Sequence, residues 1–397
     1  MKLCDFLIEG QKATWKQTPG FILFPMRLFC YKTNFPNRRV RKTICYCQET
    51  RVEDRNLLIF GLGYLGKAIA MQLAKQGWNV TGTKRKLTMD KELMESGIEV
   101  IELDTESSGQ LSETILQKLF WATCILISIP ANHQGDPLLN KLEKQINLQS
   151  FPKHRIRWIG YISSTVIYEP SKLDNWIDED APLAEHMNKA SYYISAEEQW
   201  RKWTKDSKIR LVIFRLSALY GPFRSALDTL IRIQLLHRNV EGFLQSSAFV
   251  GDVLVSRIHL TDACEKIIAS MVVSESILFL NPCIINLSDD LPCTRSEVFY
   301  YALQLLDEST VNAWNALYLR REDKQLSIPF RESFTTSLQD VYKGIRTRIF
   351  DSKKGKRILN QRMKTLLGDY LHFPTYRQGL LHIKNDILIR YHSVFKG

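Results

Sequence analysis

The stretch that decides the fold reads Leu57-Leu58-Ile59-Phe60-Gly61-Leu62-Gly63-Tyr64-Leu65-Gly66. A short apolar strand runs into a G-x-G-x-x-G turn, and the turn opens an amphipathic helix predicted over Lys67–Gln76. The first glycine permits the tight turn, the second lets backbone approach a pyrophosphate, and the third lets the helix pack on its strand. The N–H groups at the start of such a helix favour phosphate. The stretch therefore predicts a dinucleotide site that includes Gly61, Gly63, Tyr64, Leu65 and Gly66.

The end of the second predicted strand bears on which dinucleotide binds. A site that prefers NAD usually carries Asp or Glu there, to hold the ribose hydroxyls. This chain has Thr83-Lys84-Arg85-Lys86 instead. Cations at this position attract a 2′-phosphate, whereas a carboxylate repels it. We therefore expect NADP(H), with Thr83, Lys84 and Arg85 as cofactor contacts. The alternative is NAD(H), with a solvated basic loop.

Short apolar strands alternate with helical patterns along the first half of the chain. The strands are predicted at 57–60, 79–83, 98–102, 124–129, 156–162 and 209–215, with helices such as Leu111–Trp121 and Lys189–Thr204 between them. Strands connected in this way pair in parallel through right-handed crossovers. The alternation predicts an α/β fold with a Rossmann-type, doubly wound parallel sheet.

The pattern loosens after Pro222 and becomes mostly helical. Helices are predicted at Ala226–His237 and Thr261–Met271, and a third opens with the capping-box sequence Thr294-Arg295-Ser296-Glu297. Residues 307–356 are charged and irregular, so we expect no core there. The sequence predicts a smaller, mostly helical C-terminal lobe.

Three regions are therefore expected, at 1–54, 55–222 and 223–397: a separate N-terminal segment, an NADP-binding Rossmann domain, and a lobe on the substrate side that interleaves with the sheet. The first 50 residues hold nine Lys or Arg and three Asp or Glu, which is half of the net charge of +12. A basic, acid-poor segment resembles an organelle-targeting presequence, although this one contains no serine. We expect import into an organelle, a plastid ahead of a mitochondrion. The alternative is a disordered basic arm on a cytoplasmic enzyme.

Several classes of function have no support in the sequence. No apolar run approaches the roughly 18 residues that a membrane span needs, so no membrane insertion is expected. The basic charge is not interleaved with aromatic residues as in nucleic-acid modules, so no nucleic-acid partner is expected. Cys45 and Cys47 form a C-x-C pair with no second pair or His cluster, so no metal site is expected.

Blocks of sequence in a fixed order resemble a known family. They are the glycine turn, Ile162-Ser163-Ser164-Thr165-Val166-Ile167-Tyr168, Arg215-Leu216-Ser217-Ala218-Leu219-Tyr220-Gly221-Pro222 and Arg257-Ile258-His259-Leu260-Thr261-Asp262. The last three are similar to S-S-x-x-V-Y, R-x-x-x-x-Y-G-P and R-x-I-H-x-x-D of atypical extended short-chain dehydrogenases/reductases, in the NAD-dependent epimerase/dehydratase superfamily. Ser128-Ile129-Pro130 and Phe373-Pro374-Thr375-Tyr376 resemble its YeeZ-like branch. The resemblance covers residues 55–385.

The resemblance implies a catalytic group of three residues, which this chain does not complete. In the superfamily a Ser or Thr orients the substrate oxygen, a Tyr moves the proton, and a Lys four residues later lowers the pKa of that Tyr. Ser164 matches the serine. However, Ala196 follows Tyr192 by four residues and Glu197 follows Tyr193, so no Tyr-x-x-x-Lys is found. A Glu at the lysine position would raise the pKa of the tyrosine.

The register of this helix stays open at the level of sequence. Glu197 or Glu198 can instead match an acidic position further along the same helix of the family, in which case the tyrosine is absent. The catalytic candidates are Ser164 and Tyr193, and packing is the competing interpretation of Tyr193.

Other positions carry two interpretations each. Asp104 contacts adenine or caps a turn, and Ser128, Ile129 and Pro130 are expected beside the cofactor. Arg224 and Arg257 hold a substrate phosphate or form ion pairs. We expect an NADP-binding oxidoreductase or epimerase-like enzyme for a small sugar-like or phosphorylated carbonyl substrate. The alternative is a non-catalytic NADP(H)-binding sensor or scaffold.

Overall fold

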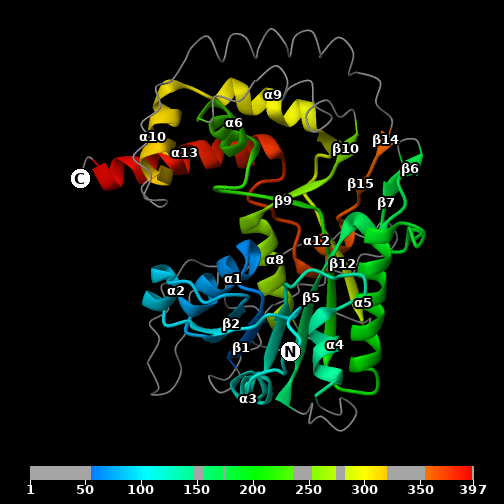
Figure 1. The fold of residues 1–397 in the computed structure, drawn as a ribbon. Coiled ribbons are helices and arrows are strands. Elements are labelled where there is room, and N and C mark those ends of the chain that lie inside the picture. Colours follow the sequence, from blue (N-terminus) through cyan, green and yellow to red (C-terminus); the bar gives the residue numbers. More distant parts are fainter. Residues whose placement is uncertain are drawn as a thin grey trace, which may run out of the picture. The chain divides into compact units, whose positions relative to one another are not determined.

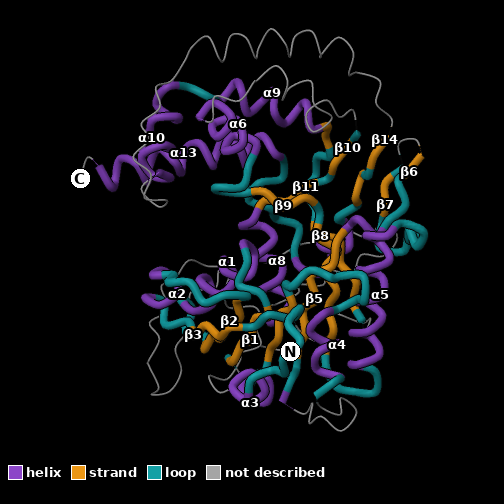
Figure 2. The backbone as a smooth tube through the Cα atoms, in the orientation of Figure 1, coloured by secondary structure: helices purple, strands orange, loops and turns teal. Residues whose placement is uncertain are grey.

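A computed structural model describes residues 55–145, 155–172, 175–235, 253–273, 282–319 and 354–395 of the chain, and all of these belong to one compact unit, Cys47–Gly397. Its centre is a seven-stranded sheet of order β12-β8-β5-β4-β1-β2-β3 (Figures 1 and 2). Every neighbouring pair in this sheet is parallel. The strands are β1 (Asn56–Phe60), β2 (Asn79–Lys84), β3 (Glu99–Glu102), β4 (Cys124–Ile127), β5 (Trp158–Ser164), β8 (Arg210–Leu216) and β12 (Cys283–Leu287). The predicted Rossmann-type sheet is confirmed.

The central strands are nearly continuous apolar runs because helices cover both faces of the sheet. The largest core cluster joins side chains of β1, β4, β5 and β8 to the helices α3 (Glu113–Trp121), α4 (Pro137–Glu143) and α5 (Asn188–Thr204). A second group contains α1 (Tyr64–Ala74), α8 (Leu260–Val272) and α12 (Gln361–Leu367): α8 contacts both α1 and α12, and α12 contacts β12. Helix α1 begins three residues before the predicted start and ends two residues earlier than predicted. The short helix α2 (Lys91–Glu95) contacts β3.

The C-terminal lobe is built mainly from α6 (Ala226–Leu235), α9 (Arg295–Leu305), α10 (Glu308–Leu319) and α13 (Tyr376–Phe395), which lie together at the top of Figure 1. The predicted capping box at Thr294 and Glu297 is confirmed. The prediction that residues 307–356 add no core is wrong for α10. Trp314 is buried there, and its Nε1 donates a hydrogen bond of 2.8 Å to Oδ1 of the buried Asp228.

Short strands connect the lobe to the central sheet. β9 (Ala218–Tyr220) pairs in parallel with β11 (Arg257–His259), and β7 (Trp176–Ile177) with β15 (Arg357–Ile358). A further sheet has the order β13-β10-β14-β6, formed by Cys293–Thr294, Leu254–Val255, Lys354–Gly355 and Ser171–Lys172. The chain beyond residue 222 thus returns to the sheet, since β12 pairs with β8. The predicted segment 1–54 lies outside the described residues.

Within the described ranges no helix is long and apolar enough to cross a membrane. The same ranges hold no cluster of three or more His, Cys, Asp or Glu side chains suited to a metal ion.

Candidate active site

The glycine turn lies at the point where the strand order of the sheet reverses. Strand β1 has β2 on one side and β4 on the other, which makes it the switch point of the sheet, where folds of this kind hold their ligands. A Cβ atom on Gly61 would lie 3.2 Å from the backbone of Ser128 and 3.2 Å from the Ile129 side chain. The structure therefore brings Gly61 against Ser128 and Ile129, two of the residues expected beside the cofactor, while Pro130 is exposed.

Gly61, Gly63 and Gly66 have the backbone geometry that a dinucleotide-binding turn requires. Gly61 has a φ of +100°, which favours glycine. A Cβ on Gly66 would lie 2.2 Å from the carbonyl oxygen of Gly61, so only glycine lets α1 approach this closely. Gly63 is exposed, and a Cβ there would meet no atom within 4 Å. No side chain caps the start of α1, whose N–H groups fit a pyrophosphate.

Thr83 supports the turn from the end of β2. Its Oγ1 accepts a hydrogen bond of 3.1 Å from the Gly61 N–H, and its carbonyl oxygen accepts one of 2.8 Å from the Leu62 N–H. The side chain is buried. These residues fit a dinucleotide, with Thr83 acting through the backbone of the turn.

The basic loop after β2 is neutralised by carboxylates. Asp90 lies 2.9 Å from Lys84 Nζ and 2.8 Å from Lys67 Nζ. Partial burial opposes ionisation of Asp90, but the hydrogen bonds from Lys67 and Lys84 outweigh it and lower its pKa to about 2. Arg85 is exposed and lies 3.4 Å from Glu106. The cations expected to attract a 2′-phosphate therefore already have anionic partners.

Asp104 caps a turn. Its Oδ1 accepts a hydrogen bond of 3.0 Å from the Glu106 N–H and lies 3.9 Å from Arg85 Nε. Of the two interpretations offered by the sequence, the structure shows the turn cap.

The two catalytic candidates lie on different elements. Ser164 ends β5, and its Oγ accepts a hydrogen bond of 3.2 Å from the Val166 N–H at the start of the 3₁₀ helix η3 (Thr165–Ile167). Tyr193 lies on α5 and packs against a cluster that contains Ile167 and Tyr168. Burial raises the pKa of Tyr193. These contacts fit the packing interpretation of Tyr193.

Helix α5 is held to the sheet by a buried ion pair. Glu197 and Arg215 form two hydrogen bonds, of 2.9 Å from Nη2 to Oε2 and 3.1 Å from Nε to Oε1. Ser163 Oγ adds a bond of 2.6 Å to Oε1 of the same carboxylate. Glu197 thus faces the sheet, which fits the alternative in which it matches an acidic position of the family's helix. Neither this role for Ser163 nor the pairing of Glu197 with Arg215 was predicted from the sequence.

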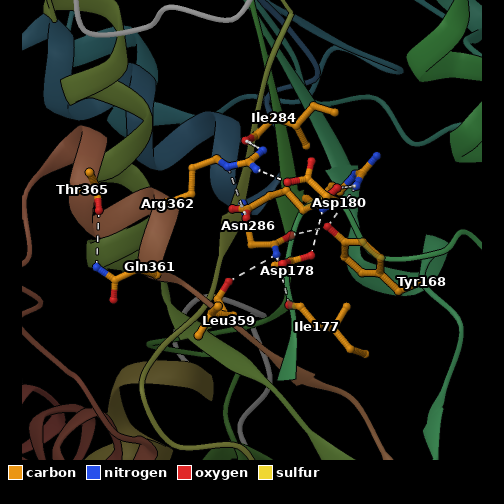
Figure 3. Close-up of polar contacts among 12 residues, drawn as sticks. Tyr168, Ile177, Asp178, Asp180, Ile284, Asn286, Leu359, Gln361, Arg362 and Thr365 are labelled. Atoms are coloured by element: carbon orange, nitrogen blue, oxygen red, sulfur yellow. Dashed lines mark hydrogen bonds and ion pairs between the residues drawn. The ribbon is translucent and has the colours of Figure 1, made fainter. Parts of the chain in front are cut away.

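This ion pair extends into a buried polar network. Arg215 Nη1 donates to the Tyr168 hydroxyl at 3.0 Å, and that hydroxyl donates to Asn286 Oδ1 at 2.6 Å. Asn286 N–H donates to Glu179, and Arg362 lies 2.6 Å from Asp180 (Figure 3). Burial raises the pKa of Tyr168, so its hydroxyl stays protonated. The network joins β5, β8 and β12 to the C-terminal segment, and its partners lie too far apart in sequence to form a motif.

Two cavities adjoin the carboxyl ends of β5 and β8. We call the first, of about 560 Å³, the serine cavity, because Ser164, Thr165, Ser217, Ser256 and Lys356 are its polar lining. We call the second, of about 440 Å³, the arginine cavity, because Arg224, Arg232, Arg257 and Arg295 line it. Both cavities are lined by Ala218 and Val255, so they are adjacent.

Tyr64 connects the glycine turn with the arginine cavity. Its hydroxyl donates a hydrogen bond of 2.8 Å to the Pro222 carbonyl oxygen, and the Arg224 guanidinium lies 5.5 Å from its ring centroid. A Cβ on Gly221 would lie 2.5 Å from this hydroxyl, so glycine is required there. Burial raises the pKa of Tyr64. The cofactor turn and the lobe are therefore in contact through one side chain.

His259 caps α8 rather than facing either cavity. Its Nδ1 accepts a hydrogen bond of 3.2 Å from the Thr261 N–H, and the ring is fully buried. Burial, aided by His382 and His372, lowers its pKa to about 3. His259 is thus a neutral structural residue at neutral pH.

Comparison with known sequences agrees with this geometry. Residues 57–273 match the NAD dependent epimerase/dehydratase family. Protein YeeZ of Escherichia coli strain K12 is 28% identical over 172 residues, which cover 43% of this chain and 61% of YeeZ. The match therefore spans less than two thirds of that relative.

Solved structures share the fold over most of the chain. A conserved protein of unknown function from Silicibacter pomeroyi is 26% identical, with a TM-score of 0.55, and the match covers 83% of this chain and 98% of that one. The UDP-glucuronic acid 4-epimerase of Bacillus cereus in complex with NAD is 14% identical, with a TM-score of 0.52, and covers 84% and 99%. MoeE5 in complex with UDP-glucose and NAD is 14% identical, with a TM-score of 0.52, and covers 86% and 100%. With its glycine turn at the switch point and its incomplete catalytic group, the chain belongs to the NAD dependent epimerase/dehydratase family, as an atypical, YeeZ-like short-chain dehydrogenase/reductase.

Proposed function

We propose that this protein is an NAD(P)-dependent oxidoreductase or epimerase-like enzyme for a sugar-like or phosphorylated carbonyl substrate. The observation that carries the proposal is the adjacency of the two cavities, which share Ala218 and Val255. The arginine cavity receives the anionic part of the substrate, and the serine cavity receives the carbon that reacts.

The charge of the arginine cavity favours a phosphate. Its lining contains Arg224, Arg232, Arg257 and Arg295. The acidic lining residue, Asp228, is turned to internal partners, since its carboxylate accepts hydrogen bonds from Ser225 and Trp314. Guanidinium groups bind phosphate through paired hydrogen bonds. The UDP-sugars named for MoeE5 and for the UDP-glucose 4-epimerase of Thermotoga maritima carry a diphosphate beside a sugar, which supports this substrate class.

The serine cavity offers the chemistry. Ser164 Oγ accepts from the Val166 N–H, so its own O–H proton is available to a substrate oxygen. The residue follows a central parallel strand, at the edge where such sheets hold their ligands. A nicotinamide dinucleotide, when bound, supplies or accepts hydride at the substrate carbon.

We propose NADP(H) over NAD(H) as the cofactor. Lys84 and Arg85 stand where a site for NAD usually has a carboxylate. A 2′-phosphate would compete with Asp90 for Lys84 and with Glu106 for Arg85. The preference for NADP(H) therefore requires the 2′-phosphate to displace these carboxylates from Lys84 and Arg85.

A second candidate function is a non-catalytic NADP(H) sensor or scaffold. Its support is the absence of Tyr-x-x-x-Lys on α5, where Tyr193 packs in a cluster and Glu197 pairs with Arg215. The serine cavity at Ser164 and the adjacent arginine cavity favour the enzyme, because a protein that only binds a dinucleotide has no need of them.

The test combines binding with turnover. Titration calorimetry measures the affinities for NADPH and NADH. A screen for NADPH oxidation tests sugar nucleotides and small carbonyl compounds as substrates. Arg224→Ala should weaken binding of UDP, used as an anionic probe, while Arg390→Ala is the control, because Arg390 pairs with Asp386 on α13 away from both cavities. Tight NADPH binding, with no turnover and no binding of UDP, would favour the sensor.

We also propose that residues 1–54 direct the protein to an organelle, with a plastid ahead of a mitochondrion. The support is their share of the positive charge. N-terminal sequencing of protein from its native cells should find a start between Thr43 and Asp54. Recovery of Met1 would favour the cytoplasmic alternative.

A further inference from the structure

A lysine from the C-terminal part of the chain lines the serine cavity. Lys356 Nζ lies 3.1 Å from the carbonyl oxygens of Thr165 and Val166, the two residues that follow Ser164. These bonds use two of the three hydrogens of the ammonium group. We propose that Lys356 is a catalytic residue that binds the oxygen of the carbonyl substrate and protonates it on reduction. This inference rests on the proposed function. It names the residue that supplies the proton in a reduction for which the chain has no Tyr-x-x-x-Lys.

The backbone around Lys356 holds the side chain in place. Its N–H donates a hydrogen bond of 3.1 Å to the Leu254 carbonyl oxygen, and its carbonyl oxygen accepts one of 3.0 Å from Ser256 Oγ. Gly355 has a φ of +140°, and a Cβ there would lie 2.4 Å from the Leu254 carbonyl oxygen. A close approach that only glycine allows therefore sets the position of Lys356, as a preorganised catalytic group requires.

A second polar group in the same cavity lacks a partner. Ser217 is 4% exposed, and its Oγ has no hydrogen-bond partner among the residues that the structure describes. A buried hydroxyl without a partner is unfavourable, and a hydrogen bond from Ser217 to a ligand oxygen would offset this cost. Most of the remaining lining is apolar, including Val166, Leu254 and Ile358. A few polar groups in an apolar cavity are typical of a small-molecule site.

The surroundings of Lys356 ease release of its proton. Burial lowers the pKa of this amine, and the charge of Glu169 opposes the change only in part. A lower pKa makes an ammonium group a better acid near neutral pH. Tyr193 changes in the opposite direction, since burial raises its pKa. Lys356 is thus the better proton donor of the two.

The proposed step balances as a carbonyl reduction. The carbonyl carbon receives a hydride, with its two electrons, from NAD(P)H, and the carbon–oxygen double bond becomes a single bond. Lys356 gives one proton to the oxygen, so the products are the alcohol, NAD(P)⁺ and a neutral amine. Water then returns the proton to Lys356.

Reductive trapping of an aldehyde tests the inference without a cofactor. The full chain is incubated with glycolaldehyde and cyanoborohydride across a pH series, and the modified lysines are located by peptide mass spectrometry. Lys266 is the matched control, because burial lowers its pKa too and its Nζ bonds three carbonyl oxygens, but it lines neither cavity. We expect Lys356 to react about tenfold faster than Lys266 at neutral pH, because Lys356 lines a cavity that a small aldehyde can enter and Lys266 does not.

Two variants separate catalysis from a structural role. Lys356→Arg can keep the bonds to the two carbonyl oxygens but cannot release a proton at neutral pH. It should melt like the wild type and lose about a hundredfold in turnover of any carbonyl found by the screen. Ala218→Trp, which narrows the cavity, should slow trapping at Lys356 and leave exposed lysines unchanged.

Trapping of Lys356 no faster than that of Lys266, or full turnover by Lys356→Arg, would overturn the inference. Because trapping needs neither cofactor nor natural substrate, its failure is distinct from failure of the proposed function, which is measured by NADPH and UDP binding.

Discussion

Glu197 Oε2 lies 2.9 Å from Arg215 Nη2, and both side chains are 2% exposed. The pair joins α5 to β8 in the interior, directly beneath the end of β5. Glu197 also lies four residues after Tyr193, so this helix carries no Tyr-x-x-x-Lys. The helix that usually supplies a catalytic Tyr and Lys serves here to hold the sheet.

Breaking this pair should therefore destabilise the fold and not only reduce activity. Glu197→Gln leaves the Arg215 charge buried without its counter-ion, and loss of one partner of a buried pair costs about 3–5 kcal/mol. Urea denaturation measures the change in the free energy of unfolding. Glu198→Gln, at an exposed neighbour 3.7 Å from Arg201, should cost less than about 1 kcal/mol. Equal losses in the two variants would contradict this assignment.

Gly63→Asp should abolish cofactor binding and leave the fold intact. A Cβ at this position meets no atom within 4 Å, so the carboxylate disturbs little except the anion site at the start of α1. Calorimetry with NADPH and NADH measures the loss, and circular dichroism checks the fold. Gly109→Asp is the control, because a Cβ at Gly109 also meets nothing within 4 Å. If Gly63→Asp still bound the cofactor, the site would lie elsewhere.

Lys84 and Arg85 should discriminate between the two cofactors. Their replacement by Ala should weaken the binding of NADPH by about ten- to a hundredfold, since charged hydrogen bonds contribute about 1.5–3 kcal/mol. The affinity for NADH should stay almost unchanged. Asp90→Asn should increase the affinity for NADPH, because it removes the carboxylate that lies 2.9 Å from Lys84 Nζ. The readout is the ratio of the two dissociation constants. An equal effect on both cofactors would argue against a 2′-phosphate site.

Ser164→Ala should lower turnover by about a hundredfold or more, the usual scale for a group that handles a proton. Tyr193→Phe should change turnover far less, because Tyr193 packs against a cluster and has no lysine to lower its pKa. The measurement is NADPH oxidation with whichever carbonyl the screen identifies. An inactive Tyr193→Phe beside an active Ser164→Ala would reverse the two roles.

Acid should weaken the fold through Asp90. Partial burial favours the protonated form, but bonds from Lys67 and Lys84 lower its pKa to about 2, below the ordinary 3.8. A carboxyl with a depressed folded-state pKa stabilises the protein above its unfolded pKa, and that stability is lost as the pH falls through the folded value. The stability gap between wild type and Asp90→Asn should therefore narrow between about pH 4 and pH 2. A gap that stays constant over this range, measured by urea denaturation, would contradict the assignment.

Local sequence was enough to predict the sheet and the glycine turn. The strand, turn and helix from Leu57 to Ala74 are contiguous, so glycine spacing and apolar periodicity specify them together. The capping box at Thr294 is local in the same way, and it too is confirmed. The cofactor side of the site could be predicted because it is built largely from such local elements.

The substrate side depends on contacts that no short pattern contains. Trp314 is buried because Asp228, 86 residues earlier, accepts its N–H. Arg215 on β8 pairs with Glu197 on α5. Because the two residues lie on different elements, the sequence did not show what Glu197 contacts. Lys84 and Arg85 were identified as cations, but their carboxylate partners became visible only in three dimensions.

The close approach of Gly355 to Leu254 also sets an order of events during synthesis. Lys356 and Thr165 are 191 residues apart, so one wall of the serine cavity is made long after the other has left the ribosome. Contacts of such long separation form slowly, because a long loop must close first. The glycine turn at residues 61–66 is synthesised before either wall of this cavity. The serine cavity is therefore complete only after Lys356 and Ile358 have been synthesised.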